Sequence, residues 1–142
     1  MPNNKITRRL AFAKEASLHS NHKQHKLGCV AYYKGAVLAI GYNDIFKTSP
    51  VQKKYNRLRG YDVETAWNTI HAEMMVLAKI RYLDIDFSKV TLYIYRGYKN
   101  GDSALARPCK ACMAAIADIG IKQVYYTTDN GWCMEYINKL EE

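Results

Sequence analysis

The fold is decided by two apolar runs and the pair between them: Leu27-Gly28-Cys29-Val30-Ala31-Tyr32-Tyr33, then Lys34-Gly35, then Ala36-Val37-Leu38-Ala39-Ile40. Two apolar runs joined by a glycine-bearing pair are typical of a β-hairpin. Gly41-Tyr42-Asn43 ends the second run. We therefore expect a sheet that begins with two antiparallel strands.

Helical and strand patterns alternate around this hairpin. Apolar side chains recur at helical spacing before and after it. Farther along the chain come a run of β-branched and aromatic residues, and then a segment that starts with proline and ends with glycine. These patterns predict a helix over 6–19, a second helix within 65–82, a strand over 90–95, a third helix over 109–119 and a strand over 124–127.

The tail predicts a second hairpin. Asn130-Gly131 lies between two strand-like runs, and Asn-Gly is the strongest short hairpin signal. The alternative is a short helix over 132–140. With the hairpin, the element order predicts an α/β fold, a three-layer α/β/α domain around one mixed five-stranded sheet. We expect residues 1–142 to form this one domain.

Composition narrows the class of protein. The chain has 142 residues, and 49% of them are hydrophobic, which is enough for one core without disulfides. With no apolar leader and no run long enough for a membrane span, the four cysteines are expected to be thiols of a cytoplasmic protein. The net charge of +8 permits polyanionic or phosphate-bearing partners but does not demonstrate them.

Two thiols and one imidazole have the spacing of a zinc site. Cys109 and Cys112 stand at i and i+3 of a predicted helix that starts at Pro108. Residues at that spacing share a helix face, with Cβ atoms about 5–6 Å apart, so both sulfurs can bind one Zn²⁺. His71 offers a third ligand. Three protein ligands leave one position for water, which marks a catalytic rather than a structural zinc.

Glu73 follows His71 by two residues, close to the predicted metal but not placed to bind it beside His71. A carboxylate there can move protons between water and substrate. The other two cysteines, Cys29 and Cys133, lie in apolar strand patterns, and we expect both in the core. His19, His22 and His25 are expected to be solvated, with His22 or His25 at the mouth of the pocket.

His71-Ala72-Glu73, followed after 34 residues by Pro108-Cys109-Lys110-Ala111-Cys112, resembles the signature of the cytidine deaminase superfamily. The hairpin and the strand at 90–95 extend the similarity over roughly residues 5–137. The resemblance implies that a zinc-activated water attacks C4 of cytosine, or C6 of adenine, while Glu73 transfers the proton. It also implies that Asn43 contacts the sugar and that the backbone N–H of Ala72 contacts the base.

The substrate is less determined. Relatives with a C-terminal hairpin are mostly cytidine-type or toxin-type deaminases, whereas those acting on tRNA adenosine or dCMP usually insert a helix, so the tail favours cytosine. Residues 44–63 form a long basic segment, expected to be a loop with at most a short helix. Within it, cations around Tyr55 suit a polynucleotide, because phosphates pair with cations and bases stack on tyrosine.

We therefore favour deamination of cytosine in single-stranded DNA or RNA. Three alternatives stay open: a deaminase of free cytidine, deoxycytidine or dCMP, a tRNA-type adenosine deaminase, and a non-catalytic zinc-containing module that binds nucleic acid. The sequence leaves the oligomeric state open.

Overall fold

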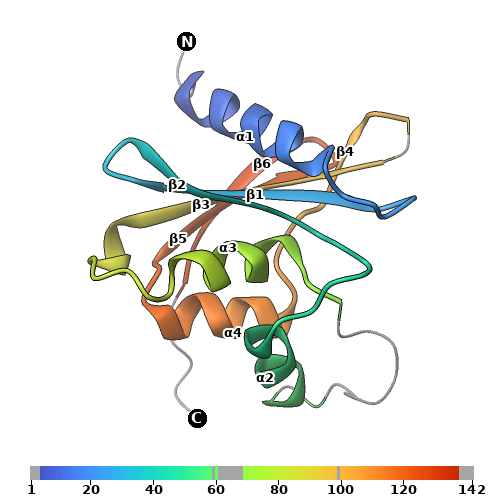
Figure 1. Cartoon of the computed structure of the whole chain (residues 1–142). Coiled ribbons are helices and arrows are strands. Elements are labelled where there is room, and N and C mark those ends of the chain that lie inside the picture. Colours follow the sequence, from blue (N-terminus) through green and yellow to red (C-terminus); the bar gives the residue numbers. More distant parts are fainter. Residues whose placement is uncertain (1–3, 59, 61–68, 99, 138–142) are drawn as a thin grey trace.

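The computed structural model of the chain describes residues 4–58, 60, 69–98 and 100–137. One mixed sheet forms its centre, with the strand order β2-β1-β3-β5-β6 (Figure 1). The strands β1 and β3 are antiparallel, β3 and β5 are parallel, and β5 and β6 are antiparallel. Their bounds are β1 Lys26–Tyr33, β2 Ala36–Tyr42, β3 Val90–Gly97, β5 Gln123–Thr128 and β6 Gly131–Tyr136.

The helices cover the two faces of this sheet unequally. Helix α1 (Asn4–Ser17) lies on one face, and α2 (Pro50–Leu58), α3 (Ala72–Ile80) and α4 (Lys110–Ile119) lie on the other (Figure 1). A three-residue 3-10 helix, Phe87–Lys89, leads into β3. The layers are those of the predicted α/β/α fold.

Both predicted hairpins are present. Tyr33 pairs with Ala36, and the two residues between them, Lys34 and Gly35, both have positive φ, which matches the twist of the flanking strands. Thr128 pairs with Gly131 at the second hairpin. The alternative helix over 132–140 is therefore wrong for residues 132–136, and residues 138–142 lie outside the described part.

The sheet has one strand more than the five that were expected. The two-residue strand β4 (Ser103–Ala104) pairs with the end of β3 at Arg96 and Gly97. A strand this short carries no measurable alternation, so the sequence pattern did not indicate it. This pairing ties the loop between β3 and α4 back to the end of β3, and it holds the backbone of Arg96 in place.

Two glycines allow the close packing of helices on the sheet. A Cβ atom on Gly28 would lie 1.9 Å from the carbonyl oxygen of Ala13 in α1, and one on Gly41 would lie 2.4 Å from that of Ala72 in α3. Real side chains do not fit at either distance. Gly41 therefore sets how closely β2 approaches the first residue of α3, which carries the candidate site.

The helix boundaries differ from the prediction in informative ways. The basic segment 44–63 contains α2, which buries Val51, Gln52, Tyr55 and Asn56 on one side and exposes its cations. The second predicted helix is described only as α3, since 61–68 lie outside the described residues.

None of the helices in the described ranges has the length and hydropathy needed to cross a lipid bilayer.

Candidate active site

Two helix starts bring the three predicted metal ligands together. His71 is the N-cap of α3 and Cys109 is the N-cap of α4, and neither side chain caps its own helix. Cys112 lies in the first turn of α4 and is fully buried. The Nδ1 atom of His71 lies 3.7 Å from the Cys109 sulfur and 3.3 Å from the Cys112 sulfur.

These distances fit a zinc ion. Tetrahedral coordination with Zn–N near 2.0–2.1 Å and Zn–S near 2.3 Å puts nitrogen and sulfur about 3.6 Å apart. All three ligand atoms lie within 4.8 Å of one another. Among the described residues, no other group of three or more His, Cys, Asp or Glu side chains is arranged to hold a metal ion. The His-Cys-Cys set and its geometry are those of a zinc site with three protein ligands.

The electrostatics of the site favour a thiolate. The pKa of the Cys109 thiol is lowered to about 4, first because the Cys112 thiol donates a hydrogen bond to it and then because of His71. The same hydrogen bond and burial raise the pKa of Cys112. A divalent cation would replace the proton that the two sulfurs share. Because α3 and α4 both begin here, the positive ends of their dipoles add to the stabilisation of negative charge.

Glu73 lies in the first turn of α3 with only 2% of its surface exposed. Its Oε1 atom is buried, and no group in the described part of the chain forms a hydrogen bond with it. Burial raises the pKa of Glu73 above its ordinary value, against the opposing effect of His71. A buried carboxyl with a free oxygen and a raised pKa is suited to take up and release a proton.

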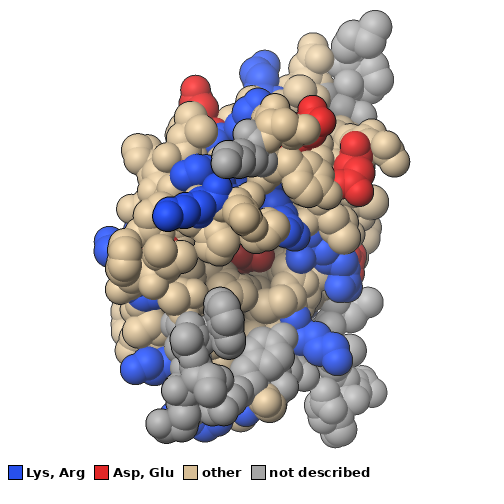
Figure 2. All heavy atoms as spheres, turned by 90° about the vertical axis from the view of Figure 1, so that its right-hand side faces the viewer, with Lys and Arg blue, Asp and Glu red and all other residues tan. Residues whose placement is uncertain are grey.

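A cavity of about 470 Å³ opens above these residues. This size is in the range of small-molecule sites. The molecule is hollowed on the face where α3 and α4 begin, with acidic atoms in the depth and Lys and Arg side chains around the hollow (Figure 2). The cavity is lined by His22, His25, Leu27, Asn43, Asp44, Ile45, Thr69, Ile70, His71, Ala72, Glu73, Arg96, Arg107 and Cys109.

The two predicted substrate contacts both line this cavity. Ala72 is the first residue of α3, so its backbone N–H belongs to the turn that has no partner within the helix. The amide of Asn43 also holds the cavity wall: its Oδ1 accepts from the N–H of Leu27 at 2.9 Å, and its Nδ2 donates to the carbonyl of His25 at 2.7 Å. Against the described residues, one proton and one lone pair of that amide stay available.

Gln52, which the sequence did not single out, positions His71. It is fully buried in α2, and its Oε1 accepts a hydrogen bond from the backbone N–H of His71 at 3.0 Å. Its Nε2 donates to Asn56 at 2.9 Å. The available signal was the spacing of residues 51, 52, 55 and 56, which share one helix face, but polar residues on that face did not indicate a buried contact.

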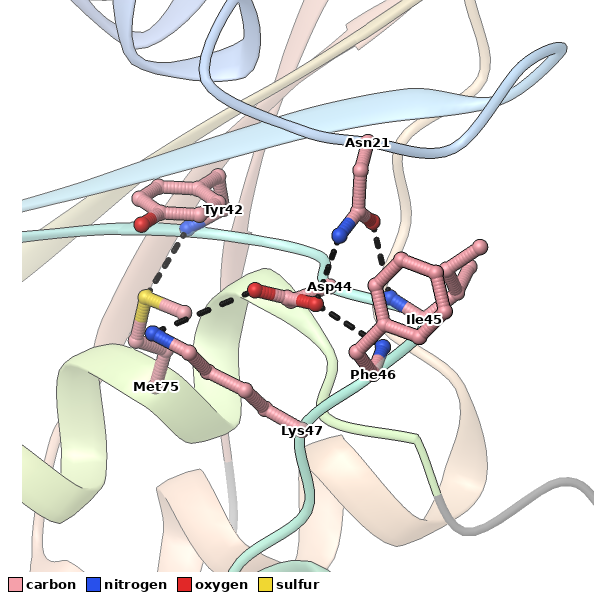
Figure 3. A network of polar contacts seen from close by, with 7 residues as sticks. All are labelled: Asn21, Tyr42, Asp44, Ile45, Phe46, Lys47 and Met75. Atoms are coloured by element: carbon pink, nitrogen blue, oxygen red, sulfur yellow. Dashed lines mark hydrogen bonds and ion pairs between the residues drawn. The ribbon is translucent and has the colours of Figure 1, made fainter.

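A polar network fixes the segment that follows β2. The Oδ1 atom of Asp44 accepts from the side chain of Asn21 and from the backbone N–H of Phe46, each at 2.8 Å (Figure 3). Lys47 lies 4.0 Å from the other Asp44 oxygen, and Asn21 accepts from the N–H of Ile45. The backbone N–H of Asp44 bonds to the carbonyl of Ile70. This segment is thereby tied to the residue before His71.

Of the other residues that the sequence singled out, some lie where they were expected and some do not. His22 and His25 line the cavity, as expected. Tyr55 is buried and its hydroxyl donates to Asp118, so it is not available to stack on a base. Cys29 is buried as predicted, but Cys133 is exposed because β6 is the edge strand of the sheet.

Comparisons with known proteins agree with this site. The family model of the cytidine and deoxycytidylate deaminase zinc-binding region matches residues 3–128. A search of curated protein sequences found no match.

Solved structures share the fold. The dCMP deaminase of cyanophage S-TIM5 is 24% identical in its apo form, with a TM-score of 0.61 over 90% of this chain and 86% of that one. Its complex with dCMP and dUMP is 25% identical, with a TM-score of 0.59 over 90% and 83%. Cytidine deaminase from Burkholderia pseudomallei is 13% identical, with a TM-score of 0.64 over 92% and 91%.

The family match covers the predicted zinc ligands and the strands around them. The fold, the distances between the ligand atoms and the buried carboxyl all agree with this family match. The chain belongs to the family of zinc-dependent cytidine and deoxycytidylate deaminases, which are hydrolytic enzymes.

Proposed function

We propose that this protein deaminates the cytosine of a free nucleoside or nucleotide, adding water at C4 and releasing ammonia to leave uracil. The observation that carries the proposal is Glu73, buried beside the metal ligands with a free Oε1 in the wall of the cavity. A purely structural zinc site would gain nothing from such a carboxyl, because burying it without a partner costs free energy.

The chemistry divides between the metal and the chain. Zinc held by His71, Cys109 and Cys112 supplies a Lewis acid that makes water nucleophilic near neutral pH. Glu73 takes the proton from the attacking water on Oε1 and returns it to N3 of the ring. It then carries the remaining proton of the added water from the C4 hydroxyl to the departing amine, so that the C4–N bond breaks, ammonia leaves and the C4 carbonyl of uracil forms. The raised pKa of Glu73 suits both directions of transfer.

The cavity wall would hold the rest of the substrate. The backbone N–H of Ala72, in the first turn of α3 and on the cavity lining, would donate to the carbonyl of the base. Asn43 offers its remaining proton and lone pair to a sugar hydroxyl. Because Asn43 also holds the backbone at His25 and Leu27, its loss would change the cavity wall as well as the contact.

A free substrate is supported by two observations. The S-TIM5 structure at 25% identity is a complex with dCMP and dUMP. The tyrosine that suggested base stacking, Tyr55, is buried. The comparisons do not separate nucleotide from nucleoside, since dCMP deaminase and cytidine deaminase structures both match about nine-tenths of the chain.

One observation favours cytosine in single-stranded nucleic acid as a second candidate. Phe46 is 84% exposed and directly follows Ile45, which lines the cavity. An exposed aromatic ring there could stack on a neighbouring base. A polynucleotide substrate would also bind more weakly as salt rises from 50 to 200 mM.

The test is ammonia release by the zinc-loaded protein from cytidine, deoxycytidine, CMP, dCMP, adenosine and a cytosine-containing single-stranded oligonucleotide. We expect Glu73→Gln to keep one zinc per chain and the wild-type melting temperature while losing activity by several orders of magnitude. Cys112→Ala should instead lose the zinc, which metal analysis detects. Wild-type turnover by Glu73→Gln would remove Glu73 from the mechanism. Retained zinc with no ammonia from any substrate would favour a non-catalytic binding module.

A further inference from the structure

Arg96 is a half-buried cation that the deamination chemistry does not use. It lies on β3 and lines the same cavity as Glu73 and Cys109, and its Nε atom is buried without a hydrogen-bond partner among the described residues. No carboxylate in the described ranges pairs with its guanidinium. Arg107, on the same cavity, is different, because Glu135 binds it through two hydrogen bonds of 2.9 Å. Arg96 is therefore the arginine of the cavity that can receive an anion.

Two histidines beside Arg96 present further donors. The Nδ1 atom of His25 lies 2.8 Å from Nη2 of Arg96. A guanidinium can only donate, so this Nδ1 accepts and the ring proton of His25 is on Nε2. The Nδ1 atom of His22 likewise accepts from the backbone N–H of His25 at 3.1 Å. In the described part of the chain nothing accepts from either Nε2, so both rings offer an N–H group.

The charge around these donors is positive. The pKa of His22 is lowered by burial first and then by repulsion from His25, Lys26 and Arg96. Two carboxyls also line the cavity: Glu73 lies at the metal end, and Asp44 is already bound by Asn21 and Phe46. The corner formed by His22, His25 and Arg96 therefore combines positive potential with three unused N–H donors. We call it the Arg96 corner.

We infer that the Arg96 corner binds the terminal phosphate of the substrate, which makes the substrate a cytosine nucleoside monophosphate. This inference rests on the proposed deaminase function and adds the substrate class. A phosphate monoester has three acceptor oxygens and a charge near −2, which matches three donors in a cationic corner. An internal phosphodiester of a polynucleotide has two free oxygens and a single charge, and a nucleoside has neither.

Steady-state kinetics on dCMP and deoxycytidine tests the inference. Arg96→Gln should lower kcat/KM for dCMP by about ten- to a hundred-fold, the effect of losing hydrogen bonds to a charged group. The value for deoxycytidine should stay within about twofold. His25→Ala should act in the same direction. Arg8→Gln, which removes an equal charge from the exposed side of α1, is the matched control and should change neither value.

Inorganic phosphate gives a second measurement. It should inhibit wild type competitively against dCMP and should inhibit Arg96→Gln much less. Arg96 also donates to the carbonyl of Leu105, so thermal melting must show that the variant is folded. Arg96→Lys, which keeps the charge, is the alternative variant if Arg96→Gln does not fold. It should lower kcat/KM for dCMP less than Arg96→Gln does, and it should leave the value for deoxycytidine unchanged.

The two proposals fail in different ways. Equal kcat/KM of wild type for dCMP and deoxycytidine, or an equal loss on both in Arg96→Gln, overturns the phosphate site while deamination stands. Preference for the oligonucleotide over dCMP also overturns it. If no substrate releases ammonia, the proposed function fails. Calorimetric binding of dUMP but not deoxyuridine to the zinc-loaded protein would then still support the phosphate site.

Discussion

Gln52 is the residue whose replacement tests most directly how the fold positions the zinc ligands. We consider Gln52→Met, because methionine keeps nearly the volume of glutamine in a fully buried position. The change removes the acceptor of the 3.0 Å hydrogen bond from the backbone N–H of His71. Since the new side chain fills the same space, the effect comes from the lost hydrogen bonds and not from a cavity.

The structure sets the size of the effect. Leaving the His71 N–H without a partner costs about 1–3 kcal/mol. For a chain of this size, 1 kcal/mol corresponds to about 3 °C, so the melting temperature should fall by about 3–9 °C. Because His71 binds the metal, the looser backbone should also weaken zinc binding by about 10- to 100-fold, as changes behind metal ligands generally do.

The assay is a zinc competition titration with a chromophoric chelator, together with thermal melting. Lys53→Met, an exposed substitution on the same helix, is the control and should change neither value. Zinc affinity equal to that of the control would refute the positioning role, even if the melting temperature falls. In that case Gln52 would stabilise the packing of α2 without holding His71 in place.

Two further predictions concern the walls of the site. Gly41→Ala should destabilise the protein by about 1–3 kcal/mol and lower zinc affinity, because its Cβ would lie 2.4 Å from the carbonyl oxygen of Ala72; unchanged urea unfolding and zinc content would contradict this reading. Burial favours a higher pKa for Asp44, but hydrogen bonds from Asn21 and Phe46 and the charge of Lys47 outweigh it, so its pKa lies below its ordinary value. A lowered pKa stabilises the fold above about pH 4, and this stabilisation is lost as pH falls through the folded pKa. The difference in unfolding free energy between wild type and Asp44→Asn should therefore shrink at acid pH, and a difference that is constant from pH 3 to 6 would contradict the assignment.

The metal centre could be predicted because its signals are local. Cys109 and Cys112 are three residues apart at a helix start, and helix geometry alone brings their sulfurs to one side. His71 and Glu73 form an equally short motif at the start of another helix. The distances of 3.3 and 3.7 Å from Nδ1 to the two sulfurs agree with that prediction.

The rest of the site could not be predicted in the same way. Tyr55 was expected to contact nucleic acid, yet it packs inward and bonds to Asp118, 63 residues away. Cys133 has the alternating pattern of a core strand, but its strand is at the edge of the sheet. A pattern shows that a face is apolar. Which neighbour covers that face depends on the order of the strands.

The sequence by itself determined the five longer strands, both hairpins, the start of the helix at Cys109 and the ligand set of the zinc site, because each depends on residues a few positions apart. Only the tertiary structure decided that Gln52 holds His71 and that Asn43 braces the cavity wall. It also decided that Arg96 lies beside His25, with no carboxylate partner among the residues that the structure describes. These contacts join segments between 16 and 71 residues apart. Such pairs are set by how β1, β3 and α2 pack around the start of α3, and that packing has no short-range signature in the chain.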